Sequence, residues 1–266
     1  MFGIARRPAP VASVAALLAL ALLGAASAGA ETTQCTDVAS LAAGPPYVIT
    51  AQGVYCLNAD VVFSAVSGAA ITVDSNNVVL DLNGHKIGGG GAGGGTAAMG
   101  ILVNNHGNVI VKNGLVRGFN SGIVYQPGSA NNGNIVEDIL AVANTVFGIY
   151  FGGPGTNNTV RNCIIGATGG SSVYPGYSAG IYVVSTMSYV THCTVTNTFV
   201  TDLGTGRFGI YLNDGRAVNN QIIGDGGSSG ANIGLQLVSG IYKDNIVSGC
   251  TTPYSGGIAV GTTNYP

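Results

Sequence analysis

Charged residues are scarce in this chain and make up only 8% of its 266 residues. The few basic residues are scattered, without the positive stripe that proteins binding nucleic acid or anionic lipid need. No close pair of cysteine or histidine residues occurs, so the sequence predicts no metal site and no evident cofactor. Beyond the first thirty residues, no apolar stretch is long enough to cross a bilayer. We therefore expect neither a nucleic-acid partner nor a membrane span.

The first thirty residues differ in character from the rest. Arg6 and Arg7 are followed by an apolar run over residues 11–23, and then by small residues at 28–30 or, alternatively, 26–28. This pattern is typical of a secretory signal peptide. We expect residues 1–30 to be removed and the protein to be exported to the periplasm, the cell surface or the medium. The seven basic and eleven acidic residues that remain give a net charge of −4.

Glycine is abundant, with 44 residues, and it opens a short phrase that recurs along the chain. In this phrase a small residue is followed by an aliphatic residue, a variable one and another apolar one. From residue 100 onward the spacings are 22, 26, 32, 29, 25 and 23 residues, and the glycines are Gly100, Gly122, Gly148, Gly180, Gly209, Gly234 and Gly257. Such a period is typical of a solenoid, in which each repeat forms one turn that stacks on its neighbours.

The repeats are built from strands. Apolar residues alternate with period two, Val and Ile are dense, and Asn, Gly and Ser interrupt the runs. A repeat of 22 to 26 residues has room for three short strands and their turns. The sequence thus predicts an all-β fold, a parallel β-helix of about eight rungs over residues 68–266, preceded by an N-terminal cap and lead-in segment over residues 31–67.

Stacked rungs place equivalent residues about 4.8 Å apart in columns. One predicted column contains residues that tolerate left-handed turn geometry, namely Asn113, Asp138, Asn162, His192, Asn220 and Asp244. The preceding position carries Lys112, Glu137 and Arg161, which alternate in sign as on a solvated face. We interpret both columns as structural features that hold the rungs in register.

Two pairs of cysteines are candidates for disulfides, which an exported protein can form. Cys35 and Cys56 bracket the segment before the first rung. Cys163 and Cys193 occupy equivalent places on consecutive rungs, at a spacing that suits a bridge. A reduced pair of stacked thiols is the alternative for Cys163 and Cys193.

Two stretches resemble a known family. Residues 77–87 read Asn-Val-Val-Leu-Asp-Leu-Asn-Gly-His-Lys-Ile, and residues 109–119 read Val-Ile-Val-Lys-Asn-Gly-Leu-Val-Arg-Gly-Phe. Both resemble the opening rungs of bacterial right-handed parallel β-helix proteins of the pectin-lyase-like superfamily, including the NosD-like proteins with parallel β-helix repeats. The resemblance implies a right-handed β-helix from about Tyr47 to Val260. It indicates fold more than function, because the superfamily includes pectate lyases, polygalacturonases, alginate epimerases and proteins without assigned activity.

The predicted outward position of the first strand is tyrosine on three consecutive rungs, at Tyr150, Tyr182 and Tyr211. Exposed, regularly spaced aromatic residues offer flat faces for sugar rings, and Tyr177 in the preceding loop extends the group. This pattern favours the binding of an extended polysaccharide along one face. The alternative is that tyrosine simply fills a stacked sheet because of its high β propensity.

Charged residues near these strands suggest a catalytic alternative. Asp202, Arg207, Asp214 and Arg216 fit a site in which a base abstracts a proton beside a neutralised uronate carboxylate. The alternative interpretation is that the same residues form an ordinary solvated cluster of ion pairs without a catalytic role. If the protein is an enzyme, we expect a polysaccharide lyase, epimerase or glycoside hydrolase, with calcium implied only for a lyase. A structural or adhesive cell-surface protein is the third possibility, and the sequence leaves the oligomeric state open.

Overall fold

The computed structural model describes residues 34–90, 93–199, 206–224, 232–261 and 264–265. The predicted signal peptide therefore lies outside the described residues. From Cys35 onward the chain forms one compact unit. The prediction of an all-β fold with parallel strands is confirmed, and the described helices are two short 3-10 turns, η1 (Val38–Ser40) and η2 (Gly93–Gly95). Within the described residues, no helix has the length and apolar character needed to span a membrane.

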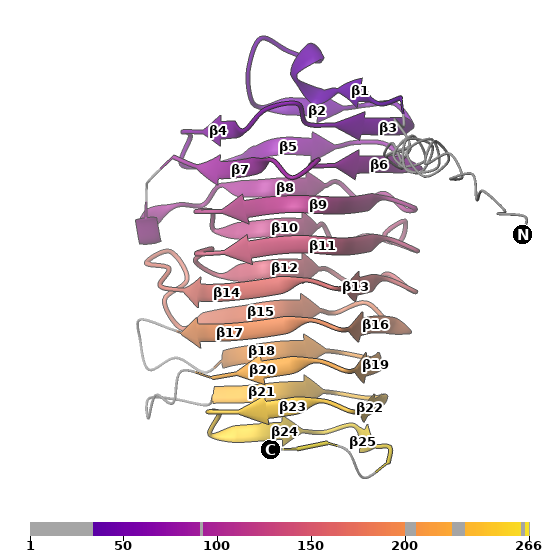
Figure 1. Cartoon of the computed structure of the whole chain (residues 1–266), viewed down its shortest axis with the longest axis vertical. Coiled ribbons are helices and arrows are strands. Elements are labelled where there is room, and N and C mark those ends of the chain that lie inside the picture. Colours follow the sequence, from indigo (N-terminus) through magenta and orange to yellow (C-terminus); the bar gives the residue numbers. More distant parts are fainter. Residues whose placement is uncertain (1–33, 91–92, 200–205, 225–231, 262–263, 266) are drawn as a thin grey trace, which may run out of the picture. The chain divides into compact units, whose positions relative to one another are not determined.

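One sheet contains nine strands, all parallel to their neighbours, and the strands follow chain order (Figure 1). Most of these strands carry the repeated glycine phrase. The strands of this nine-stranded sheet are β2 (Tyr47–Ile49), β5 (Ala69–Val73), β8 (Met99–Val103), β10 (Ser121–Tyr125), β12 (Phe147–Phe151), β15 (Tyr177–Val183), β18 (Gly206–Leu212), β21 (Asn232–Leu237) and β24 (Thr252–Ser255).

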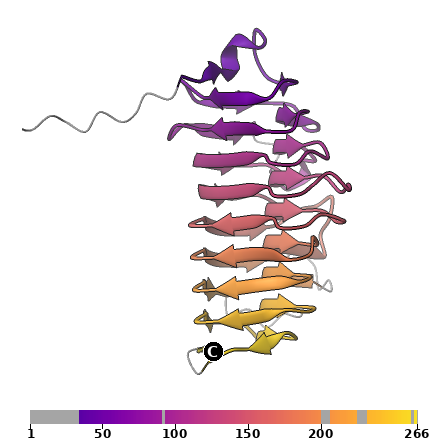
Figure 2. The same cartoon turned by 90° about the vertical axis from the view of Figure 1, so that its right-hand side faces the viewer.

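The second sheet contains sixteen strands arranged in two columns, and the side of the unit that carries its strands β13, β16, β19 and β22 in Figure 1 faces the viewer in Figure 2. The first column comprises β1 (Thr36–Asp37), β3 (Gly53–Cys56), β6 (Val78–Asp81), β9 (Ile110–Arg117), β11 (Ile135–Val142), β13 (Thr159–Arg161), β16 (Ser188–Thr191), β19 (Gly215–Val218), β22 (Ile241–Lys243) and β25 (Ile258–Ala259). The second column comprises β4 (Val61–Phe63), β7 (Lys86–Gly89), β14 (Ile164–Gly169), β17 (Thr194–Phe199), β20 (Gln221–Ile223) and β23 (Ile246–Ser248). The long strands β9 and β11 belong to both columns and join them.

The core lies between the sheets and is built from the inward-facing residues of each turn of the chain. Ile149 pairs in register with Ile181, and Ile181 with Ile210, and all three are fully buried. Between the buried residues Ile149 and Phe151, Tyr150 faces outward and is half-buried. The predicted alternation is therefore confirmed, and burial of these aliphatic columns supplies the main driving force for stacking.

The repeated glycines from Gly100 to Gly234 lie side by side on neighbouring strands of the nine-stranded sheet, with no room for a side chain. The repeat predicted at Gly257 is wrong, because β24 takes the next place in this sheet and Gly257 lies after it, directly before β25 of the other sheet. A β-carbon on Gly148 would lie 2.6 Å from the carbonyl oxygen of Gly180 and would collide with Ile165 in the core. A β-carbon on Gly209 would likewise lie 2.6 Å from the carbonyl oxygen of Gly234. Close approach of adjacent backbones therefore explains the glycine in each repeat.

The turn between the two strand columns of the sixteen-stranded sheet is made on successive rungs by a residue with left-handed backbone conformation. These residues have φ angles between 54° and 59° and are Asn113, Asp138, Asn162, His192, Asn219 and Asp244. The predicted column is thus wrong at one rung. Since Thr191 pairs with Val218, the next residue, Asn219, takes the turn position. Asn220 is instead buried, and its Oδ1 accepts a hydrogen bond of 3.0 Å from the backbone N–H of Cys193.

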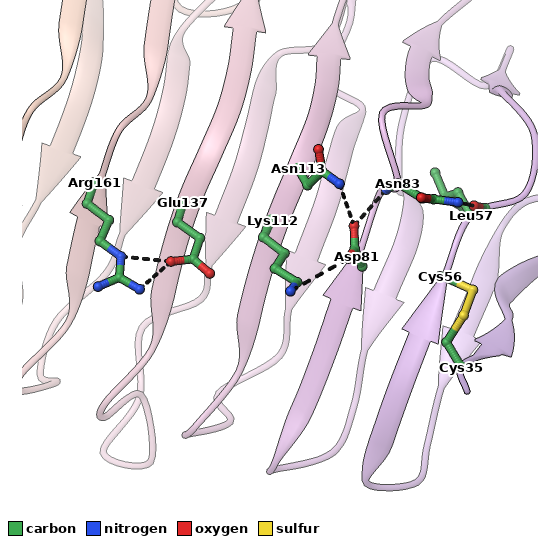
Figure 3. A network of polar contacts seen from close by, with 9 residues as sticks. All are labelled: Cys35, Cys56, Leu57, Asp81, Asn83, Lys112, Asn113, Glu137 and Arg161. Carbon is green, nitrogen blue, oxygen red and sulfur yellow. Dashed lines mark hydrogen bonds and ion pairs between the residues drawn. A yellow bond between two sulfur atoms is a disulfide. The ribbon is translucent and has the colours of Figure 1, made fainter. Parts of the chain in front are cut away.

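Charged side chains of neighbouring rungs alternate on the outer face as predicted. Glu137 pairs in register with Lys112 on one side and with Arg161 on the other. Arg161 Nε donates to Glu137 Oε2 at 2.7 Å, whereas Lys112 Nζ lies 3.6 Å from Asp81 Oδ2 (Figure 3). Such partly exposed ion pairs contribute only about 0–1 kcal/mol each, so they set register more than stability.

The cysteines differ in state. A disulfide joins Cys35 to Cys56, whose Cα atoms are 5.7 Å apart, and attaches the first described residues to β3 (Figure 3). Cys163 and Cys193 are buried free thiols on consecutive rungs. The hydrogen bond with the Cys193 thiol, together with burial, raises the pKa of Cys163 well above its ordinary value. The Cys163 thiol therefore stays protonated at neutral pH.

Candidate functional site

Six aromatic side chains gather on the outer face of the nine-stranded sheet, and we call them the aromatic cluster. They come from β12, β15 and β18, and each is in contact with at least two others. They are Phe147, Tyr150, Tyr177, Tyr182, Phe208 and Tyr211. The pairing of Tyr150 with Tyr182, and of Tyr182 with Tyr211, places the three column tyrosines on neighbouring strands.

The rings of the tyrosine column stack on one another. The ring centroids of Tyr182 and Tyr211 are 4.2 Å apart with planes at 13°, and those of Tyr150 and Tyr182 are 6.0 Å apart at 20°. Phe147 stacks on Tyr150 at 4.9 Å and 21°. A ring face that packs against a neighbouring ring is covered, so the column is not the row of open platforms that the sequence suggested.

Tyr177 fills a space that small neighbours leave. It pairs with Gly206, where a β-carbon would lie 2.8 Å from the Tyr177 ring. Ala179 lies next to Phe147 in register and is also small. The ring of Tyr177 is edge-on to Phe147 at 5.8 Å and to Tyr182 at 5.7 Å. These edge-to-face contacts fix Tyr177 within the cluster.

The tyrosine hydroxyls of the cluster are poor acids. Burial raises the pKa of Tyr150, Tyr177 and Tyr211 above the ordinary phenol value. The rise is largest for Tyr177, where a hydrogen bond with Tyr182 adds to the effect of burial. These three hydroxyls stay protonated at neutral pH, so they serve as hydrogen-bonding groups and not as bases.

A cleft of about 470 Å³ opens beside Phe147 and Tyr150, at the end of the cluster that adjoins β10. Its floor consists of the outer faces of β8, β10 and β12. The aromatic cluster forms one end, and loop residues form a side. The lining residues are Ala97, Met99, Asn120, Ser121, Val124, Val146, Phe147, Tyr150, Tyr174 and Tyr177.

Two loops from distant parts of the chain meet beside this cleft. One contains η2 and precedes β8, and the other joins β14 to β15 and carries Tyr174; both lie on the same side of the strands in Figure 1. The backbone N–H of Ser172 donates to the Gly94 carbonyl oxygen at 2.8 Å. Ser171 Oγ accepts from the backbone N–H of Tyr174 at 3.0 Å. These contacts hold Tyr174, 55% exposed, in the cleft lining.

Buried polar groups lie at the other side of the cleft. Asn120 Nδ2 donates to the Thr96 carbonyl oxygen at 3.2 Å, and Ser121 Oγ donates to Asn120 Oδ1 at 3.1 Å. Both side chains are buried, so their positions are fixed by these bonds before any ligand arrives. The combination of aromatic surface with a few fixed polar groups is typical of small-ligand sites.

The structure separates the predicted catalytic residues. Asp202 lies outside the described residues. Arg207, in β18, is 2% exposed and hence buried. Asp214 directly precedes β19 and Arg216 lies in it, beyond the opposite end of β18. The structure thus brings Asp214 and Arg216 together and places Arg207 elsewhere.

Asp214 and Arg216 line a second groove of about 380 Å³. The Asp214 carboxylate accepts hydrogen bonds from the backbone N–H of Met187 at 3.0 Å and from Ser239 Oγ at 2.9 Å. The Arg216 guanidinium lies 5.8 Å from the centre of the Tyr189 ring. Because Tyr189 and Arg216 belong to strands of the sixteen-stranded sheet, this groove and the aromatic cluster are separate surfaces.

Phe147, Phe208 and Tyr174 are not among the site residues that the sequence predicts. A signal for the first two exists, since Phe147 and Phe208 each directly precede a repeated glycine. Tyr174 has no such signal, because it reaches the cleft only through contacts between loops. Among the residues that the structure describes, no group of three or more His, Cys, Asp or Glu side chains is arranged to hold a metal ion.

Comparison of the chain with family models, with curated proteins and with solved structures finds no match. The fold itself defines the class, a β-solenoid of parallel strands. Within that class, the features that distinguish this protein are the aromatic cluster and the adjoining cleft.

Proposed function

We propose that the protein is an exported right-handed parallel β-helix of the pectin-lyase-like kind that binds a polysaccharide on the outer face of its nine-stranded sheet. The observation that carries the proposal is the aromatic cluster with a cleft at its end. A sugar ring has an apolar face that packs on aromatic surface and hydroxyls that need polar partners. In the cleft, Tyr150 and Tyr174 provide aromatic surface for the apolar face of a sugar, and Asn120 and Ser121 provide polar partners for its hydroxyls.

Export is supported by two independent features. The first thirty residues follow the pattern of a secretory signal. The disulfide between Cys35 and Cys56 is of the kind that persists in oxidising compartments outside the cytosol. A polysaccharide of the cell envelope or the surroundings is the partner that such a location offers.

Affinity electrophoresis in gels that contain neutral or acidic polysaccharides tests this proposal. We expect at least one polysaccharide to retard the protein, and Tyr150→Ala to weaken the retardation about tenfold because an aromatic contact is lost. Tyr265→Ala is the matched control, since Tyr265 is exposed and does not line the cleft. Failure of every polysaccharide to retard the protein would end the proposal.

The groove at Asp214 and Arg216 supports a second function, an acidic-polysaccharide lyase or epimerase. An arginine beside a carboxylate on an open surface fits the recognition of a uronate and the abstraction of its proton. Lyase action creates an unsaturated uronate that absorbs in the ultraviolet. We expect any such activity to be lost in Arg216→Ala and kept in Tyr150→Ala, and absence of the absorbing product from all acidic polysaccharides would exclude the lyase.

A further inference from the structure

We infer that the cleft beside Tyr150 binds one or two neutral sugar rings of the polysaccharide, and that the aromatic residues outside its lining, Tyr182, Phe208 and Tyr211, take no part in binding sugar. The inference rests on the proposed function and narrows it to one place and one class of ligand. It follows from the orientation of the rings, the extent of the cleft and the charge of its lining.

Ring orientation restricts where stacking on a sugar is possible. The near-parallel packing of Tyr182 on Tyr211, at 4.2 Å, leaves no space between these rings for a ligand. An edge-on contact from Tyr177 and a tilted contact from Phe208 further enclose Tyr182. A polymer lying along the column would therefore meet ring edges. The rings of the cluster that line the cleft are those of Phe147, Tyr150 and Tyr177, at the other end of the stack.

Tyr174 supplies an open aromatic surface. It lines the cleft, and more than half of its side chain is exposed. Within the described part of the chain its ring packs against no other aromatic ring, unlike the six rings of the cluster. The hydrogen bond from the backbone N–H of Tyr174 to Ser171 Oγ and the one from Ser172 to Gly94 fix the loop that presents Tyr174. Tyr174 is thus placed to cover a sugar ring bound on the floor.

The dimensions of the cleft fit a short ligand. Its floor crosses β8, β10 and β12, and three strands spaced about 4.8 Å apart span roughly 10 Å. Its volume of about 470 Å³ falls in the range of small-molecule sites, roughly 300–1,000 Å³. The site therefore suits a chain end or a short internal stretch of a polysaccharide.

The lining excludes an acidic sugar. Its ten residues are apolar, aromatic or neutral polar, and none carries a charge. A uronate carboxylate bound there would lose water without gaining a cationic partner, which is strongly unfavourable. Sugar hydroxyls, in contrast, find the Asn120 Oδ1 and Ser121 Oγ atoms as acceptors. A neutral pyranose fits this chemistry.

The test is calorimetric titration with neutral oligosaccharides of glucose, mannose or xylose, from monosaccharide to hexasaccharide, and with oligogalacturonides as the acidic probe. We expect a neutral series to bind with an affinity that levels off at the disaccharide. Tyr174→Ala is expected to weaken binding about tenfold. Tyr211→Ala, the matched change at the far end of the stack, is expected to leave the affinity within about twofold, with circular dichroism confirming the fold of both variants.

The outcomes separate this inference from the proposed function. If the protein binds polysaccharide but affinity rises with every added sugar, or if Tyr211→Ala weakens binding as much as Tyr174→Ala, the cleft is not the sole site and the inference is wrong. Preference for oligogalacturonides would equally overturn it. If no carbohydrate binds at all, the proposed function fails as well.

Discussion

Each side chain in a β-solenoid is restricted most by the equivalent residues above and below it. The repeated glycines show this clearly, because a β-carbon at Gly180 would lie 2.8 Å from the carbonyl oxygen of Gly209 and would collide with Val195. The same restriction acts on the aromatic residues. Tyr177 fits only because Gly206 lies beside it.

Gly180→Ala tests the restriction on the glycine column. We expect it to lower the free energy of unfolding by about 1–3 kcal/mol, because the added methyl group overpacks the core and pushes adjacent backbones apart. Gly44→Ala is the matched control, since a β-carbon there meets nothing within 4 Å. Urea denaturation measures both. Equal midpoints for Gly180→Ala and the parent would show that the backbone relaxes without cost.

Turns between strands are held by polar contacts across rungs as well as by backbone geometry. In the turns that follow β5 and β8, His106 Nε2 lies 3.1 Å from Asp74 Oδ1, and its Nδ1 lies 3.2 Å from Asn76 Oδ1. Asn104 Nδ2 also donates to Asp74 Oδ1, at 3.1 Å. The hydrogen bonds from His106 and Asn104 lower the pKa of Asp74.

This shift predicts a dependence of stability on pH. Because the pKa of Asp74 is lower in the folded state, its contribution is present above the ordinary carboxyl value of about 3.9 and is lost as the pH falls through the folded pKa. Asp74→Asn should therefore lose less stability than the parent between about pH 5 and about pH 2. Thermal melting across this interval measures the difference, which high salt should reduce. Identical pH profiles would contradict the prediction.

The molecule as a whole is stabilised by contacts between successive turns. Pairs of strands that touch are neighbours in the stack, and no strand pairing joins the first turn to the last among the described residues. Stability in such a protein is nearly a sum of local contributions. The disulfide between Cys35 and Cys56 should accordingly protect the N-terminal turn and leave distant turns unchanged.

Reduction of this disulfide tests the local character of stability. We expect faster hydrogen exchange in β1 to β4 and unchanged exchange in β12, β15 and β18. The reason is that the disulfide links residues 21 positions apart and so stabilises the terminal turn by about 3 kcal/mol. The double variant Cys35→Ser/Cys56→Ser should show the same exchange pattern with or without reductant. A uniform rise along the whole chain would mean that the turns unfold as one unit.

The periodicity of the sequence was enough to predict stacked parallel strands. A strand that is buried on one side needs apolar and polar residues in alternation, and the close contact between the backbones of neighbouring strands needs the repeated glycine. The periodicity also gave the inward position of Ile149 and the outward position of Tyr150. The predicted turn column is wrong at Asn220 because the adjacent Asn219 suits a left-handed turn equally well, and only the strand register distinguishes the two residues.

The tertiary structure alone decided which outward residues form a site. Periodicity fixes the side of a strand from which a ring projects, but ring orientation depends on neighbouring side chains, and the tyrosines stack face to face as a result. The approach of the Tyr174 loop to η2 depends on contacts between distant turns. Arg207 is buried between the neighbouring strands, in register with Ser178 on one side and Asn232 on the other. Local sequence determines where each residue stands within its own turn, and packing between turns determines what that residue can touch.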